Sequence, residues 1–150
     1  MLELTPEMAT QFVHRAVPAI ARLGVVVDAI SPGTVELRVP FEGNGNHMGT
    51  MYAGALFAVA ELPGGLIPLS VLDPGRYVPI VTDMRVHFLA AARTDVRLTA
   101  RMEPDDLRVL AERADADGQA EFVLQMSAED LNGRTVLASE ATYVLRRARS

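Results

Sequence analysis

Apolar and polar residues alternate along two stretches of the chain, which is the pattern of a strand with one buried face. In residues 34–39 every second residue is apolar, and residues 95–102 alternate in the same way without a break. Residues 25–30 are apolar apart from Asp28, and the turn-forming residues 31–33 separate them from the first stretch. The pattern therefore predicts a hairpin of residues 25–30 and 34–39, and a further strand at 95–102.

Tight-turn dipeptides punctuate the second half of the chain. Asp117-Gly118 and Asn132-Gly133 are both strong signals for a turn between two strands. The segments that flank them, together with one long apolar segment earlier in the chain, read as strands: residues 77–92, 107–113, 120–128 and 134–147. We therefore expect a mostly antiparallel sheet of five to seven strands.

Helical periodicity replaces alternation in two places. The first helix has Thr5 as a candidate N-cap and Pro6 at its first position, and should end before Gly24. The second covers residues from 53 onward and is apolar nearly all round, with one acid, Glu61, near its middle. A central acid and several prolines and glycines disfavour a membrane span at residues 53–72, so we interpret it as a buried helix.

These elements predict an α+β fold. A sheet with alternating strands needs cover on its apolar face, and a helix that is apolar on all sides needs to be enclosed. One long central helix wrapped by a curled antiparallel sheet, with a short N-terminal helix, is the hot-dog architecture. We expect residues 1–150 to form a single hot-dog domain, whose exposed sheet edges favour a homo-oligomer, a dimer or a tetramer.

Composition narrows the possible functions. The net charge is −5 and all 14 basic residues are arginines scattered along the chain, so nucleic acid is a poor candidate partner. There are no cysteines, which excludes thiolate chemistry and disulfides, and the three histidines show no metal-ligand spacing. We predict no metal, no cofactor and no membrane partner. No signal peptide is visible at the start of the sequence, so we expect a cytoplasmic location.

Glu61 is the first candidate for chemistry. On a helix its face is shared by Gly54, Phe57 and Ala58 before it and by two glycines after it, so the carboxylate stands over a shallow trough. Pro63 cannot donate a hydrogen bond within the helix, so the helix should bend just beyond the acid. A poorly solvated carboxylate has a raised pKa, which suits a general base or a nucleophile.

The start of the same helix supplies the second candidate. Its first backbone N–H groups lack partners within the helix and lie at the positive end of the helix dipole. Those of Ala53 and Gly54 could bind a polarised carbonyl oxygen, as an oxyanion hole does. Asn46 and His47 lie in the glycine-rich loop just upstream.

These residues resemble a motif of the hot-dog acyl-CoA thioesterases of the phenylacetate-pathway type. In that family an Asn precedes a His-Gly-Gly by six positions and an Asp or Glu follows the His by nine; Asn46, Tyr52 and Glu61 stand at those spacings. The segment "VTDMRVHFLAAA" also resembles the family's third strand. Residues 46–61 resemble still more closely a branch of thioesterase-like proteins with the pattern NHxGTxxAGALFxxAE.

The resemblance implies hydrolysis of an acyl thioester, with coenzyme A as part of the substrate. Glu61 would be the base that activates water or the nucleophile, and the amide of Ala53 or Gly54 would hold the carbonyl oxygen. Asn46 would orient the water or the carbonyl across a dimer interface. Thr82 lies near the position where the family places a hydroxyl of the partner subunit.

Two residues depart from the family pattern. Tyr52 replaces the His and can donate a hydrogen bond but is not a base near neutral pH, and Ala53 replaces the first Gly. The acyl chain would run along the helix near Leu56 and Phe57.

Other interpretations stay open. Glu61 could be a buried structural acid and Asn46 could cap a turn. The Tyr52 substitution favours a non-catalytic acyl- or lipid-binding module. A hydratase or dehydratase would need a histidine beside the acid, and only His47 could serve.

Overall fold

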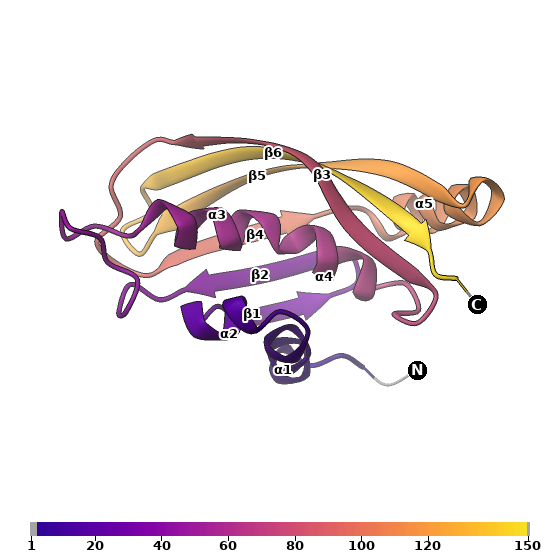
Figure 1. Ribbon diagram of the computed structural model, residues 1–150, viewed down its shortest axis with the longest axis horizontal. Coiled ribbons are helices and arrows are strands. Elements are labelled where there is room, and N and C mark those ends of the chain that lie inside the picture. Colours follow the sequence, from indigo (N-terminus) through magenta and orange to yellow (C-terminus); the bar gives the residue numbers. More distant parts are fainter. Residues whose placement is uncertain (1–2, 150) are drawn as a thin grey trace.

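The computed structural model describes residues 3–149, so residues 1, 2 and 150 of the predicted domain lie outside the described part (Figure 1). Six strands form one antiparallel sheet in the order β1-β2-β4-β5-β6-β3. They are β1 (Val26–Ser31), β2 (Thr34–Val39), β3 (Tyr77–Phe88), β4 (Val96–Arg101), β5 (Gln119–Asp130) and β6 (Thr135–Arg147). The predicted α+β fold and its strand number are confirmed.

The strands predicted from alternation are the ones that the sheet uses. β1 and β2 pair antiparallel as a hairpin, and β4 pairs with the other side of β2. In β4 the buried and exposed residues alternate along the whole strand, as its sequence predicts. Alternation succeeds here because one face of these strands packs on the core while the other faces solvent.

The central helix lies across the concave face of the curled sheet (Figure 1). It consists of α3 (Ala53–Glu61) and α4 (Pro63–Leu69), which meet at Leu62. The break falls at the predicted place because Pro63 has no N–H to donate into the preceding turn. The residues that face the sheet are fully buried, among them Val59 and Ile67. This is the hot-dog arrangement.

The N-terminal segment forms two helices rather than one, α1 (Pro6–Ala16) and α2 (Pro18–Leu23). As predicted, the hydroxyl of Thr5 caps α1 by accepting a hydrogen bond from the N–H of Met8. The helix breaks at Val17 because a proline follows it, and the residue before a proline is driven out of the helical conformation. Gly24 ends α2 in a left-handed conformation, with φ 73°.

The strand predicted at residues 107–113 is wrong. These residues belong to a helix, α5 (Pro104–Asp117), with Pro104 at its start and two aspartates in its first turn. Its buried residues, Leu107, Leu110, Ala111 and Ala114, recur at helical spacing. Asp117-Gly118 is therefore the end of a helix and not a turn between strands, with Gly118 at φ 84°.

β3 forms one edge of the sheet and pairs only with β6 among the described strands. Several of its large apolar side chains are exposed: Val78, Ile80, Val81 and Phe88. The pairing with β6 shifts register between Val81 and Asp83, which leaves Thr82 at a bulge. No helix within residues 3–149 combines the length and the apolar character that crossing a membrane requires.

Candidate active site

The loop before α3 is held by two asparagines. The buried side chain of Asn44 donates to the carbonyl oxygens of Leu23 and Pro40, at 2.7 and 2.8 Å. The backbone carbonyl oxygen of Asn44 accepts a hydrogen bond from the backbone N–H of Tyr52, at 2.7 Å. Asn44 therefore fixes Tyr52, the N-cap residue that directly precedes α3. Sequence reasoning missed it, because an asparagine in a glycine-rich loop looks like any turn residue.

Asn46 builds the tip of the same loop. Its side-chain oxygen accepts hydrogen bonds from the N–H of Met48 at 2.9 Å and of Thr50 at 3.1 Å. Its amide nitrogen donates to the Thr50 hydroxyl oxygen at 3.0 Å, which leaves one amide hydrogen free. The loop geometry thus gives Asn46 the turn-capping role that was the alternative interpretation, with one remaining donor for a ligand.

The start of α3 presents free amides, as predicted. Among the described residues, the N–H groups of Ala53 and Gly54 donate to no backbone or side-chain acceptor, whereas those of Ala55 and Leu56 donate to the Tyr52 carbonyl oxygen. No non-glycine residue of the described chain has a positive φ, so Ala53 supplies its amide without backbone strain.

Tyr52 covers the start of the helix. Its side chain is 58% exposed and its ring folds back over Gly54, where a Cβ would overlap the ring. This explains why glycine stands at position 54: the aromatic ring occupies the space above it. The phenol hydroxyl therefore also lies over Gly54. There it can donate a hydrogen bond to a carbonyl oxygen that the free amides bind.

Glu61 ends α3 on its outward face and is half-buried. Its carboxylate is in no ion pair of the described structure, and burial raises the pKa of the carboxyl above its ordinary value of 4.5. The predicted raised pKa is thus borne out, with desolvation as its cause. A carboxylate that is neither well hydrated nor paired is a stronger base than a surface glutamate.

Tyr143 of β6 lies beneath Glu61 and was not predicted. Its hydroxyl donates to the backbone carbonyl oxygen of Glu61 at 2.8 Å. Its ring lies against Gly64, where a Cβ would overlap it, and stacks on Phe122 with centroids 5.2 Å apart. Burial, and secondarily the charge of Glu61, raise the pKa of Tyr143. Tyr143 therefore stays protonated and anchors the end of α3.

The two halves of the predicted site lie at opposite ends of α3. Ala53 and Glu61 are eight residues apart, which is roughly 12 Å along a helix axis. A cavity of about 290 Å³ joins Asn46 and Ala53 to Leu56 and the end of β3, and Glu61 is not among the residues that line it. Within one chain, Glu61 therefore does not share the cavity that Asn46 and Ala53 line.

The other predicted site residues are dispersed. Phe57 is 44% exposed, one turn before Glu61, and lies outside the cavity that Leu56 lines. The hydroxyl of Thr82 donates to the carbonyl oxygen of Thr142 across the β3–β6 pair, at 3.3 Å. His47 is exposed at the loop tip. The outward face of α3 thus carries the carboxylate of Glu61, which is in no ion pair of the described structure, and the exposed ring of Phe57. The edge strand β3 carries further exposed apolar side chains.

Residues 5–145 match the model of a family described as a domain of unknown function, DUF4442. The chain belongs to the DUF4442 family. No curated protein matches the chain.

Solved structures place this DUF4442 protein among the hot-dog thioesterases. A Pseudomonas aeruginosa protein of unknown function, described as a probable thioesterase, is 38% identical, with a TM-score of 0.87 over 97% of this chain and 99% of that chain. A Chlorobaculum tepidum protein of unknown function is 17% identical, with a TM-score of 0.82 over 97% and 99%. A Haemophilus influenzae thioesterase is 19% identical, with a TM-score of 0.74 over 98% and 96%. The last two show the fold alone.

Proposed function

We propose that the protein hydrolyses an acyl thioester of coenzyme A to a free carboxylate and a thiol, with Glu61 as general base or nucleophile. The observation that carries the proposal is the half-buried Glu61 carboxylate, which has no ion-pair partner among the described residues and a pKa raised by burial. The 38% identity to a probable thioesterase over nearly the whole chain supports the same reaction class.

We propose further that the working unit is a symmetric dimer. The unpaired edge of β3, with exposed Ile80 and Val81, supports pairing with the β3 strand of a second copy. A two-fold axis normal to the sheet makes the two α3 helices antiparallel. Glu61 of one subunit then lies toward the free amides of Ala53 and Gly54 in the other, which removes the separation within one chain.

In this dimer the reaction has two steps. A water oxygen attacks the thioester carbonyl carbon while Glu61 takes the water proton, and the amides at the start of the partner's α3 hold the resulting oxyanion. The tetrahedral intermediate then collapses, the C–S bond breaks, and the thiolate takes the proton back from Glu61. If Glu61 is instead the nucleophile, its carboxylate oxygen attacks the carbonyl carbon and the C–S bond breaks, which releases the thiolate and leaves an anhydride of the acyl group with Glu61. Water then hydrolyses the anhydride to the free acid and Glu61, and the thiolate takes up the proton that the Glu61 carboxyl releases. Asn46 and Tyr52 each have a hydrogen left to donate to the carbonyl or the water.

The test is thiol release from a panel of acyl-CoA thioesters of increasing chain length. Glu61→Gln should lower kcat/KM by about 10²–10⁴-fold, because Gln cannot accept the proton. Glu112→Gln is the matched control, because Glu112 is an exposed acid on α5, far in sequence from the site. Equal activity of the wild type and Glu61→Gln would refute the role of Glu61.

A non-catalytic acyl-binding module is the second candidate. Two observations favour it. The side chain of Asn46 makes hydrogen bonds within its own loop, to Met48 and Thr50. Glu61 lines none of the three cavities described in a single chain. That module would bind acyl-CoA without releasing thiol, and Glu61→Gln would leave the affinity unchanged.

A further inference from the structure

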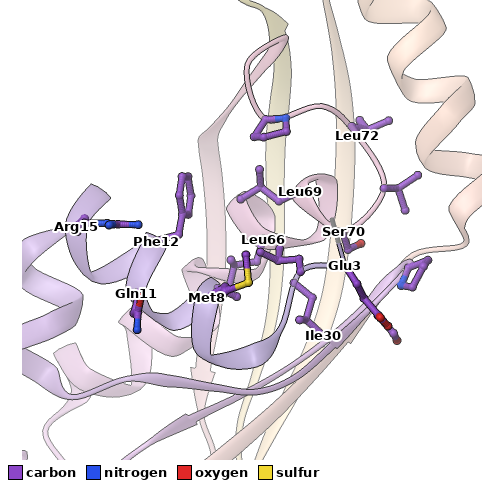
Figure 2. A pocket seen from close by; sticks show the side chains of 16 residues that line it. Glu3, Met8, Gln11, Phe12, Arg15, Ile30, Leu66, Leu69, Ser70 and Leu72 are labelled. Atoms are coloured by element: carbon purple, nitrogen blue, oxygen red, sulfur yellow. The ribbon is translucent and has the colours of Figure 1, made fainter. Parts of the chain in front are cut away.

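A second apolar recess lies away from the candidate active site. A cavity of about 670 Å³ opens between α1, the end of α4 and the loop that follows α4. Figure 2 shows Met8 and Phe12 of α1 facing Leu66 and Leu69 of α4 across it. Met8 and Phe12 lie one turn apart on α1 and are each 43% exposed, so they present contiguous apolar surface to the recess. The volume is within the range of about 300–1,000 Å³ that is typical of small-molecule sites.

The floor of the recess has little to offer a polar ligand. Ser70 lies on it, but its hydroxyl already donates to the carbonyl oxygen of Ile67 at 2.7 Å and accepts from the N–H of Gly33 at 2.9 Å. Leu66 and Leu69 complete the floor with hydrocarbon. A ligand that fills the recess should therefore be apolar over most of its length.

Charge is confined to the two ends of the recess. Arg15 lies at one end and Glu3 at the other (Figure 2). Within the described residues Arg15 is exposed and in no ion pair. An arginine fork can bind a carboxylate with two parallel hydrogen bonds. The recess thus has a cation that can bind an anion at one end of an apolar trough.

We propose that this recess binds a free medium-chain fatty acid, with its carboxylate on Arg15 and its alkyl chain between α1 and α4. Charge complementarity orients the ligand, because Arg15 attracts the carboxylate and Glu3 repels it from the opposite end. The recess follows α1 from Arg15 to Met8, which is roughly 10 Å, and continues past the start of the helix to Leu4 and Glu3. An extended chain covers about 1.2 Å per bond, so a chain of about twelve carbons spans the recess.

Two other occupants make different predictions. The acyl tail of a bound thioester could reach the recess from Glu61, since Gly65 and Leu69 follow Glu61 at one and two helical turns. That tail has no carboxylate for Arg15, and its binding would depend on the site at Glu61. A second copy of the chain would cover the recess in a dimer, and changes in the recess would then alter the oligomeric state.

The test is calorimetric titration of the protein with dodecanoate and with 1-dodecanol, both below their aggregation limits. The wild type should bind dodecanoate about five-fold more tightly than the alcohol, because a partly exposed ion pair contributes up to about 1 kcal/mol. Arg15→Gln should abolish this preference. Arg22→Gln, at an exposed arginine on α2 that does not line the recess, should keep it.

Two further variants separate the recess from the candidate active site. Phe12→Ser should weaken both ligands by about ten-fold, through the loss of apolar wall, while its exposure lets the fold tolerate the change. Glu61→Gln should leave the affinity for dodecanoate unchanged. This result does not depend on hydrolysis, so the binding site can be tested even if the proposed activity fails.

Several results would overturn the assignment. They are an absence of dodecanoate binding, equal affinity of the wild type for acid and alcohol, or a preference for the acid that survives in Arg15→Gln. A loss of dodecanoate binding in Glu61→Gln would place the ligand at the candidate active site. A change of oligomeric state in Phe12→Ser would assign the recess to a subunit interface.

Discussion

At the scale of single residues, the buried position of Glu61 costs the folded protein stability. Its side chain is half-buried at the end of α3 with desolvation unopposed by any ion pair in the described chain. The hydroxyl of Tyr143 donates its hydrogen bond to the backbone carbonyl oxygen of Glu61 and not to the carboxylate. This hydrogen bond holds the end of α3 but does not stabilise the carboxylate charge. Such a residue is typical of a functional site, where activity and stability oppose each other.

Glu61→Gln should therefore raise the free energy of unfolding at pH 7, by about 0.5–1 kcal/mol. Because the folded-state pKa of Glu61 is raised, the folded state binds more protons between the unfolded and folded pKa values, and the stability of the wild type falls as pH rises through that window. The advantage of the variant should vanish as pH falls below the ordinary carboxyl pKa. Urea unfolding at a series of pH values measures this, and Glu112→Gln should show no such trend. A Glu61→Gln protein less stable than the wild type at pH 7 would mean that the carboxylate has a structural partner.

Two neighbouring glycines of α4 should respond in opposite ways to alanine. A Cβ at position 64 would overlap the ring of buried Tyr143, whereas one at position 65 would meet nothing within 4 Å. Gly64→Ala should destabilise the protein by about 1–3 kcal/mol through overpacking. Gly65→Ala should be neutral or stabilise by up to about 1 kcal/mol, because alanine favours the helix. Chemical denaturation of the pair measures both, and equal effects would show that Tyr143 does not pack against Gly64 as described.

At the scale of elements, sequence pattern works where one physical cause dominates. Alternation located β2 and β4, because one face of each is buried, and Pro63 located the bend between α3 and α4. The pattern failed at α5, where Asp117-Gly118 has the same composition whether it joins two strands or ends a helix. The proline and two aspartates that begin α5 were the signal that could have decided it.

Sequence spacing predicted only those features of the candidate site that lie on α3 itself. Helical spacing placed Glu61 on one face with Phe57 and Ala58, and the structure shows that this is the less buried face of α3. The free amides follow from any helix start. Tyr143 lies 82 residues from Glu61 along the chain, so no spacing rule connects them. The hydrogen bonds that commit Asn46 to Thr50 depend on the fold of the loop, which its composition does not determine.

The edge of β3 is the element on which oligomerisation should depend. Ile80→Asp places a charge among exposed apolar side chains on this edge and should convert the proposed dimer into a monomer. Sedimentation velocity measures the change, and the thioesterase activity should fall with the dimer. Val109→Asp, at an apolar residue on α5 that is 52% exposed against 37% for Ile80, should leave the dimer intact. If Ile80→Asp remains dimeric, the interface lies elsewhere on the molecule.

At the scale of the whole molecule, two cavities lie at opposite ends of the central helix that α3 and α4 form. The start of α3 opens to the cavity beside Asn46, and the end of α4 opens to the recess beside α1. Glu61 lies between them on the outward face. A second copy that covers this face would bring the acid of one subunit to the amides of the other, so the dimer and not the single chain would be the catalytic unit.

Subunit complementation tests this account most directly. Ala53→Pro removes one amide hydrogen, and proline is well tolerated at the first position of a helix. Both Glu61→Gln and Ala53→Pro homodimers should be inactive, because every site then lacks one component. In a randomly mixed population about half of the dimers are mixed, and each of these has one intact site, so about a quarter of the wild-type thiol release should return. If mixing restores no activity, the acid and the amides act within one chain, which would contradict the account.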